Sequence, residues 1–174
     1  MKINRTIFLH GSDIKLSKGT ELKSSDNYEE KWSDLTSYEI LEKFRPDGVR
    51  PQKDSVFCVG CEEDLEYSGG GEEFVFVVKS IGKVTQHDMN WATEVSILLG
   101  DDVPMSDTRY EEYAKNYWHG ESAKLIGKEP VWEFMMDSAQ ILKVFDFDTE
   151  EDLDRAMAKF ESKISLSDKT SLSM

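Results

Sequence analysis

The hydrophobic residues of this chain recur at two spacings, and each spacing predicts a different element. Runs of β-branched and aromatic residues bounded by turn residues predict strands at Ile3–His10, Ser55–Val59, Glu73–Lys79, Val131–Met136 and Ile141–Phe147. Apolar residues three and four positions apart predict helices over Leu35–Phe44 and Arg109–Trp118, and Glu62–Tyr67 fits a short helix. The pattern of Met89–Leu99 is ambiguous between the two.

A further amphipathic helix is expected from Thr149 onward. The Thr149 hydroxyl can cap its first turn, and its apolar stripe comprises Leu153, Met157, Phe160 and Ile164. Strands do not alternate regularly with long helices, which indicates an α+β fold with antiparallel or mixed sheets. With 174 residues, we expect one domain over residues 1–164 and a flexible, Ser-rich tail over residues 165–174.

The composition excludes several classes of function. The chain carries 21 Lys and Arg against 35 Asp and Glu, a net charge of −14, so direct binding to nucleic acid or anionic lipid is not expected. No apolar run approaches the length of a membrane span, and the first residues do not read as a signal peptide. The two cysteines do not make a disulfide framework, so we expect a soluble cytoplasmic protein.

The first candidate for chemistry is His10-Gly11-Ser12, at the end of the first predicted strand. This triplet would place an imidazole, an unshielded backbone and a hydroxyl around one spot, because glycine lets a ligand approach the main chain closely. The alternative is a histidine at a strand end followed by an ordinary turn glycine.

A second candidate is the proline-rich loop that contains Arg45 and Arg50. Two arginines held in a rigid loop could bind a phosphate by paired hydrogen bonds, or they could balance neighbouring carboxylates at the surface.

Two further candidates have equally plain alternatives. Cys58 and Cys61 form a single CxxC, which fits buried cysteines better than a redox or zinc site because no second pair accompanies it. Glu133 interrupts an apolar strand, so its carboxylate either faces solvent or sits in a cleft with a raised pKa.

Taken together, these pieces resemble the ADP-ribosyltransferases, in particular the rifampin ADP-ribosyltransferases and related phage and bacterial proteins. The most specific match is Phe8–Ser12 followed by Ile14–Leu22, which follows the family pattern of His-Gly-Thr or His-Gly-Ser and then xxLxxGxxL. Ser55–Cys58 and Phe74–Lys79 match the next two strands, and Trp132-Glu133 matches a late strand that holds an acid. The resemblance covers residues 6 to about 145.

The resemblance implies split, mostly antiparallel sheets with short helices and an NAD-binding cleft between them. His10 would hold the adenosine-side ribose, the Gly11 backbone would bond the nicotinamide amide, and Ser12 would line the same wall. Phe57, preceded by Ser55 in the matching strand, would stack against nicotinamide, and Arg50 would reach the pyrophosphate.

Glu133 would be the catalytic acid that stabilises the oxocarbenium-like transition state, with Glu129 or Asp137 as alternatives, and no metal is expected. The expected activity is transfer of ADP-ribose from NAD to an unidentified protein or small molecule. Phe57 stands where the family commonly has Tyr.

The competing hypothesis, from the charge of −14, is a non-enzymatic acidic inhibitor that binds a host protein through a phosphate-mimicking surface.

Overall fold

The computed structural model describes residues 3, 5–24, 36–68, 71, 73–146 and 149–171, with side chains to Ile164. Its strands and helices follow in the order β1 (Ile7–Ser12), β2 (Glu21–Leu22), α2 (Thr36–Lys43), β3 (Val56–Val59), β4 (Phe74–Asp88), α3 (Met89–Gly100), α4 (Arg109–His119), β5 (Trp132–Asp146) and α5 (Leu153–Ser171). Short 3₁₀ helices lie at Gln52–Asp54 (η1), Glu62–Tyr67 (η2) and Ala123–Ile126 (η3). The expected α+β class is confirmed.

The sheet is built on the long antiparallel pair β4 and β5, which are paired from Phe74↔Asp146 to Asp88↔Trp132 and change register twice along the way. β1 adds to the outer edge of β4, and β3 and β2 add to β5, all antiparallel. β1 and β3 meet at one Cα pair, Leu9↔Val59, and this contact closes the sheet on itself.

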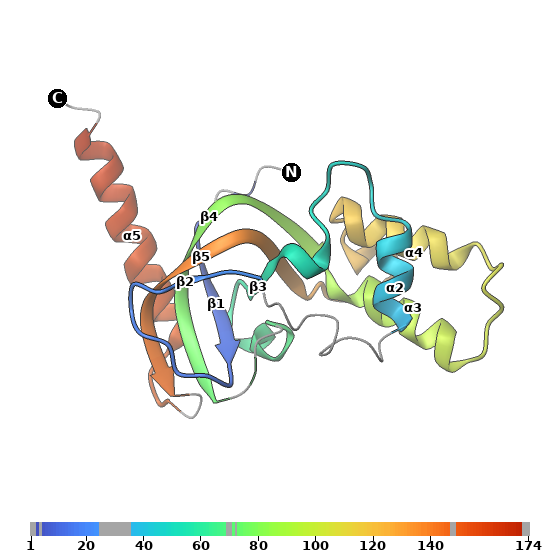
Figure 1. The fold of residues 1–174 in the computed structure, drawn as a ribbon, viewed down its shortest axis with the longest axis horizontal. Coiled ribbons are helices and arrows are strands. Elements are labelled where there is room, and N and C mark those ends of the chain that lie inside the picture. The colour runs from blue at the N-terminus through green and yellow to red at the C-terminus, as the bar shows by residue number, and fades with distance from the viewer. Residues whose placement is uncertain are drawn as a thin grey trace.

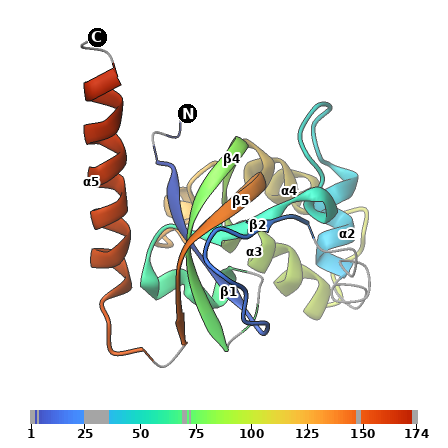
Figure 2. The ribbon, with the colours of Figure 1, turned by 60° about the vertical axis from the view of Figure 1, so that its left-hand side comes forward.

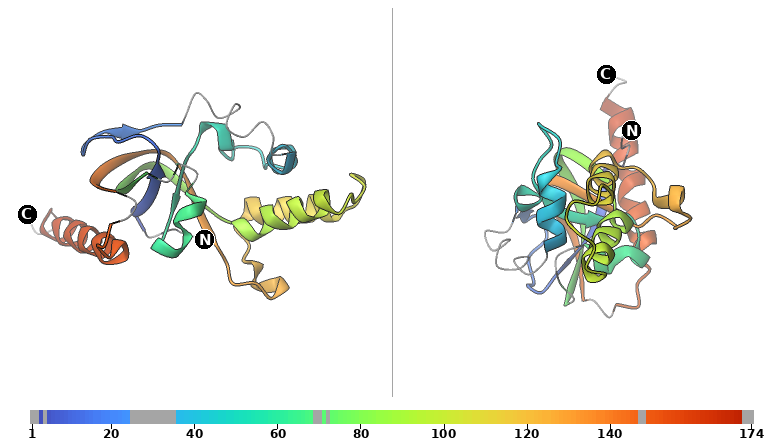
Figure 3. Two further views of the ribbon diagram at one scale, coloured as in Figure 1. Left: turned by 90° about the horizontal axis from the view of Figure 1, so that it is seen from below. Right: turned by 90° about the vertical axis from the view of Figure 1, so that its right-hand side faces the viewer.

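Side chains on the inner face of this closed sheet form one apolar cluster. Its buried members are Phe8, Leu22, Val56, Cys58, Phe76, Val78, Phe134, Met136, Ala139 and Ile141. The residues that alternate with these face outward and are covered by helices. α2, α3 and α4 pack over one end of the sheet, and α5 lies at the other end (Figure 1; Figure 3).

The sequence identifies α2, η2 and α4 correctly, and α5 buries the predicted stripe with Leu153 and Met157 in the core. Its first turn begins later than expected: Asp152, rather than Thr149, accepts the backbone N–H of Arg155 with its side chain. The last turns of α5 project away from the sheet (Figure 2), and the helix continues to Ser171, beyond the predicted start of the tail. Leu35 and Phe147, two predicted element ends, lie outside the described residues.

Two predictions about the strands are wrong. The segments predicted as separate strands at Val131–Met136 and Ile141–Phe147 belong to a single strand, β5. The polar residues between them are accommodated at a bulge, where Asp137 accepts the Lys83 backbone N–H and Gly82 adopts φ +80°. β4 likewise runs to Asp88 rather than ending at Lys79, and Met89–Gly100 is a helix.

Within the part of the chain that the structure describes, no helix combines the length and the apolar character that a membrane crossing requires.

Candidate functional site

His10 lies near the end of β1, on the inner face of the sheet. Its Nδ1 donates to the backbone carbonyl of Phe57 over 2.7 Å, and its ring stacks on Phe76 with 6.2 Å between centroids. Ser12 forms a local turn, in which its hydroxyl donates to the Ile14 carbonyl and accepts the Ile14 N–H. His10 and Ser12 are both half-buried at this end of the sheet.

Gly11 is required by close packing of the main chain. Its N–H donates to the Ser68 hydroxyl over 2.9 Å, and a Cβ at this position would lie 2.5 Å from the Gly71 carbonyl oxygen. The predicted close approach to the Gly11 backbone is therefore real, but here the approaching groups belong to the chain itself.

β1 and β3 are paired only at Leu9 and Val59 among the described residues. His10–Ser12 come after Leu9 in the chain, and Ser55–Phe57 come before Val59. Because the two strands are antiparallel, both candidate segments extend from this pair toward the same end of the sheet. The His10 hydrogen bond to the Phe57 carbonyl spans the two strands just beyond it. Two of the segments on which the family resemblance rests therefore lie side by side at this junction.

The predicted site residues that lie outside β1 do not direct their side chains toward His10. The Phe57 ring is buried in the cluster beneath α2, α3 and α4. The Ser55 hydroxyl donates to the Pro51 carbonyl over 3.0 Å. Arg50 binds the Asp54 carbonyl at 2.8 Å and the Asp137 carboxylate at 2.6 Å. None of these side chains points to the inner face that holds His10.

Glu133 is buried, with 2% of its surface exposed to solvent. It pairs across the sheet with Val59 and His87, and the Tyr117 hydroxyl donates to it over 2.7 Å. The Gln52 amide donates to the same hydroxyl over 3.2 Å. Burial raises the pKa of Glu133 from 4.5 to about 7, and the hydrogen bond from Tyr117 opposes this shift. Glu133 therefore does not face solvent, and its pKa is raised as predicted for a cleft, but the cause is full burial beside Tyr117.

His87 completes a buried polar network around Tyr117. Its Nδ1 donates to the Tyr117 carbonyl over 2.9 Å, so the neutral ring accepts at Nε2 from the Thr85 hydroxyl over 2.8 Å. Burial lowers the pKa of His87 from 6.5 to about 4. Sequence reasoning did not identify His87 or Gln52, because no local pattern links either residue to Glu133, whereas Tyr117 belongs to the apolar face predicted for the helix over Arg109–Trp118.

His10 and the predicted acids are not brought together. His10 pairs with Phe76 and shares the inner face, whereas Glu133 pairs with Val59 and shares the outer face under the helices. Asp137 is bound to Arg50 on that outer face, and the Glu129 side chain is 88% exposed in the loop before β5. The expectation of one cleft holding an imidazole, an aromatic ring and an acid is not met by this arrangement.

The two cysteines are free thiols. Cys58 is buried on the inner face, and Cys61 is half-buried at the start of η2. Among the described residues, no group of three or more His, Cys, Asp or Glu side chains could hold a metal ion.

Two acidic segments of similar sequence, Glu62–Glu66 and Glu150–Asp154, come together where η2 meets α5. The Glu62 N–H donates to Asp154, and the Leu153 N–H donates to Glu62. Burial and the nearby carboxylates Asp64 and Asp154 raise the pKa of the Cys61 thiol. The two segments therefore bring eight of the 35 acidic residues to this end of α5.

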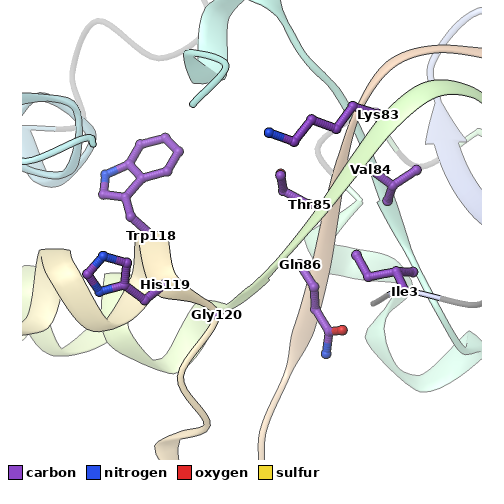
Figure 4. A pocket seen from close by; sticks show the side chains of 8 residues that line it. All are labelled: Ile3, Lys83, Val84, Thr85, Gln86, Trp118, His119 and Gly120. Atoms are coloured by element: carbon purple, nitrogen blue, oxygen red, sulfur yellow. The ribbon is translucent and has the colours of Figure 1, made fainter. Parts of the chain in front are cut away.

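A pocket of about 210 Å³ lies between the C-terminal end of α4 and β4 (Figure 4). It is lined by Ile3, Lys83, Val84, Thr85, Gln86, Trp118, His119 and Gly120. No sequence motif indicated this pocket, because its lining comes from three separate segments.

In comparisons with known proteins, the chain matches no protein-family model and no curated protein.

Proposed function

We propose that the protein binds NAD at the junction of β1 and β3, as an ADP-ribosyltransferase-like protein. The observation that carries the proposal is the His10 hydrogen bond to the Phe57 carbonyl, just beyond the single pair that joins the two strands. It brings the segment with the most specific family resemblance, Phe8–Ser12, beside Ser55–Cys58, the segment that matches the family's next strand. The antiparallel pairing of the strands agrees with that resemblance, whereas the split into two sheets that it implies is not seen, because the strands form one sheet that closes on itself.

The residues at the junction fit part of the dinucleotide. The His10 ring lies at the junction with its Nδ1 donating to the Phe57 carbonyl, and an imidazole nitrogen is the kind of group that can hold a ribose hydroxyl. The Gly11 N–H now bonds the Ser68 hydroxyl, and a carboxamide oxygen of the nicotinamide is an equivalent acceptor that could replace it. Binding therefore requires Ser68 to move.

The proposal is limited to NAD binding because Glu133, Glu129 and Asp137 all lie away from His10. Breaking the glycosidic bond builds positive charge on the ribose, and a carboxylate can stabilise that charge only if it lies beside it. Transfer of ADP-ribose to an acceptor therefore remains a prediction from the resemblance. The acidic-inhibitor hypothesis also remains a prediction, because clustered carboxylates do not by themselves specify a ligand.

Isothermal titration with NAD tests the proposal, using wild type, His10→Ala and His119→Ala. His119 is an exposed histidine at the end of α4, so its replacement is a matched control. We expect wild type and His119→Ala to bind equally and His10→Ala to bind at least tenfold more weakly. A wild-type protein that binds no NAD overturns the proposal. A parallel assay for released nicotinamide shows whether binding leads to turnover.

A further inference from the structure

Among the residues that the structure describes, the outer edge of β4 is paired with another strand along only part of its length. β1 pairs with it from Phe74 to Lys79, and the Ser80 N–H donates to the Thr6 carbonyl. The β1 ladder ends there: Arg5 is bound to the Gly60 carbonyl and to Glu161, and Ile3 lines the pocket beside Val84 and Gln86 without a strand pairing to β4. No strand in the described ranges pairs with this edge beyond Ser80.

The backbone groups that face outward can be identified from the register. The Met89 N–H donates to the Val131 carbonyl at the end of the β4–β5 ladder, so alternate residues from Met89 turn their backbone toward β5. Val84 and Gln86 lie between these positions, so their backbone N–H and C=O groups point away from β5. Gly120 supports this orientation independently, because a Cβ there would lie 2.6 Å from the Gln86 carbonyl oxygen.

The pocket beside α4 lies directly on this edge. Lys83 reaches across the open space toward Trp118 (Figure 4). Lys83 forms no ion pair with any residue of the described structure, and the lining includes Lys83 and His119 but no Asp or Glu. In a chain with 35 acidic and 21 basic residues, this pocket is locally suited to an anionic group.

We infer that an extended peptide carrying an acidic side chain docks here as an added strand on β4. The backbone of Val84 and the N–H of Gln86 would pair with the peptide main chain, as in other complexes formed by strand addition. Side chains alternate across a strand, so one peptide carboxylate would enter the pocket and meet Lys83 while its neighbours point away. The packing of Gly120 on the Gln86 carbonyl sets the end of the docking segment.

The test uses an acetylated decapeptide of alternating Thr and Glu, with the Thr and Lys counterpart as the charge control. Binding is followed by two-dimensional NMR of the full chain at about 0.15 M salt, where exposed charges are screened beyond about 8 Å. We expect the Val84 and Gln86 amides to shift and to gain protection from hydrogen exchange with the Glu peptide only.

Two variants separate charge from pairing. Lys83→Glu is expected to weaken binding at least tenfold, whereas Lys79→Glu, the same change on the covered part of β4, leaves it within twofold. Val84→Pro removes an outward N–H, a change that an edge strand tolerates, and is expected to abolish binding. The inference is overturned if the Glu peptide causes no shift at these amides, or if Lys83→Glu and Lys79→Glu bind equally.

Discussion

The pairing of Glu133 with His87 predicts a pH dependence that is hidden in the wild type and appears in single variants. Glu133 has a folded pKa of about 7 against an ordinary value of 4.5, so it destabilises the fold progressively as pH rises from 4.5 to 7. His87 has a folded pKa of about 4 against 6.5, so it destabilises the fold as pH falls from 6.5 to 4. Each contributes a slope of about 1.4 kcal/mol per pH unit, with opposite signs.

The two slopes cancel where their windows overlap, between pH 4.5 and 6.5. Glu133→Gln leaves the His87 contribution alone, so its stability relative to wild type should fall by about 3 kcal/mol on acidification across this window. His87→Gln leaves the Glu133 contribution, so its relative stability should rise by about the same amount. Subtracting the wild-type curve removes the titration of all other groups from both comparisons.

Urea unfolding followed by tryptophan fluorescence at pH 4.5, 5.5 and 6.5 measures these differences. Glu129→Gln is the matched control, because its exposed side chain should give a difference from wild type that is nearly independent of pH. The reasoning is refuted if Glu133→Gln and His87→Gln both run parallel to wild type. It is also refuted if the two slopes have the same sign.

Two further substitutions test the packing described above, each by the free energy of unfolding in urea. Gly11→Ala should destabilise the fold by about 1–3 kcal/mol, because its Cβ would meet the Gly71 carbonyl, whereas Gly100→Ala at the end of α3 has open space and should be neutral or stabilising by up to about 1 kcal/mol; equal effects would contradict this contrast. Asp88→Ala should cost more than about 3 kcal/mol, because the buried carboxylate accepts three backbone N–H groups, those of Asn90, Ala123 and Val131; a loss below about 1 kcal/mol would show that water replaces these bonds.

The helices were predictable where one face alone is apolar. The stripes of α4 and α5 follow the helical repeat, and both helices bury it. α3 escaped prediction because apolar residues are not confined to its buried face: Trp91, Val95 and Leu98 are buried, whereas Ile97 lies on the other side and is exposed. β5 was predicted as two strands because residues 137–140 are mostly polar. The neighbouring sequence does not show that a bulge in β4 accommodates Asp137.

The candidate site was predictable only in part. The sequence indicated that Gly11 permits close approach to the main chain, and in the structure the groups that approach it are Gly71 and Ser68 of the chain itself. It did not show on which face of the sheet each side chain lies, because that depends on how β1 and β3 pair through a single contact. His10 consequently shares a face with Phe76, and Glu133 lies on the other.

The most direct test of NAD binding at the junction of β1 and β3 is the backbone amide resonance of Gly11 during titration with NAD. If the dinucleotide displaces Ser68, the Gly11 signal shifts in proportion to occupancy while the amide of Gly100, on the distant α3, stays fixed. A Gly11 signal that does not move at millimolar NAD, or that moves no more than that of Gly100, contradicts the account.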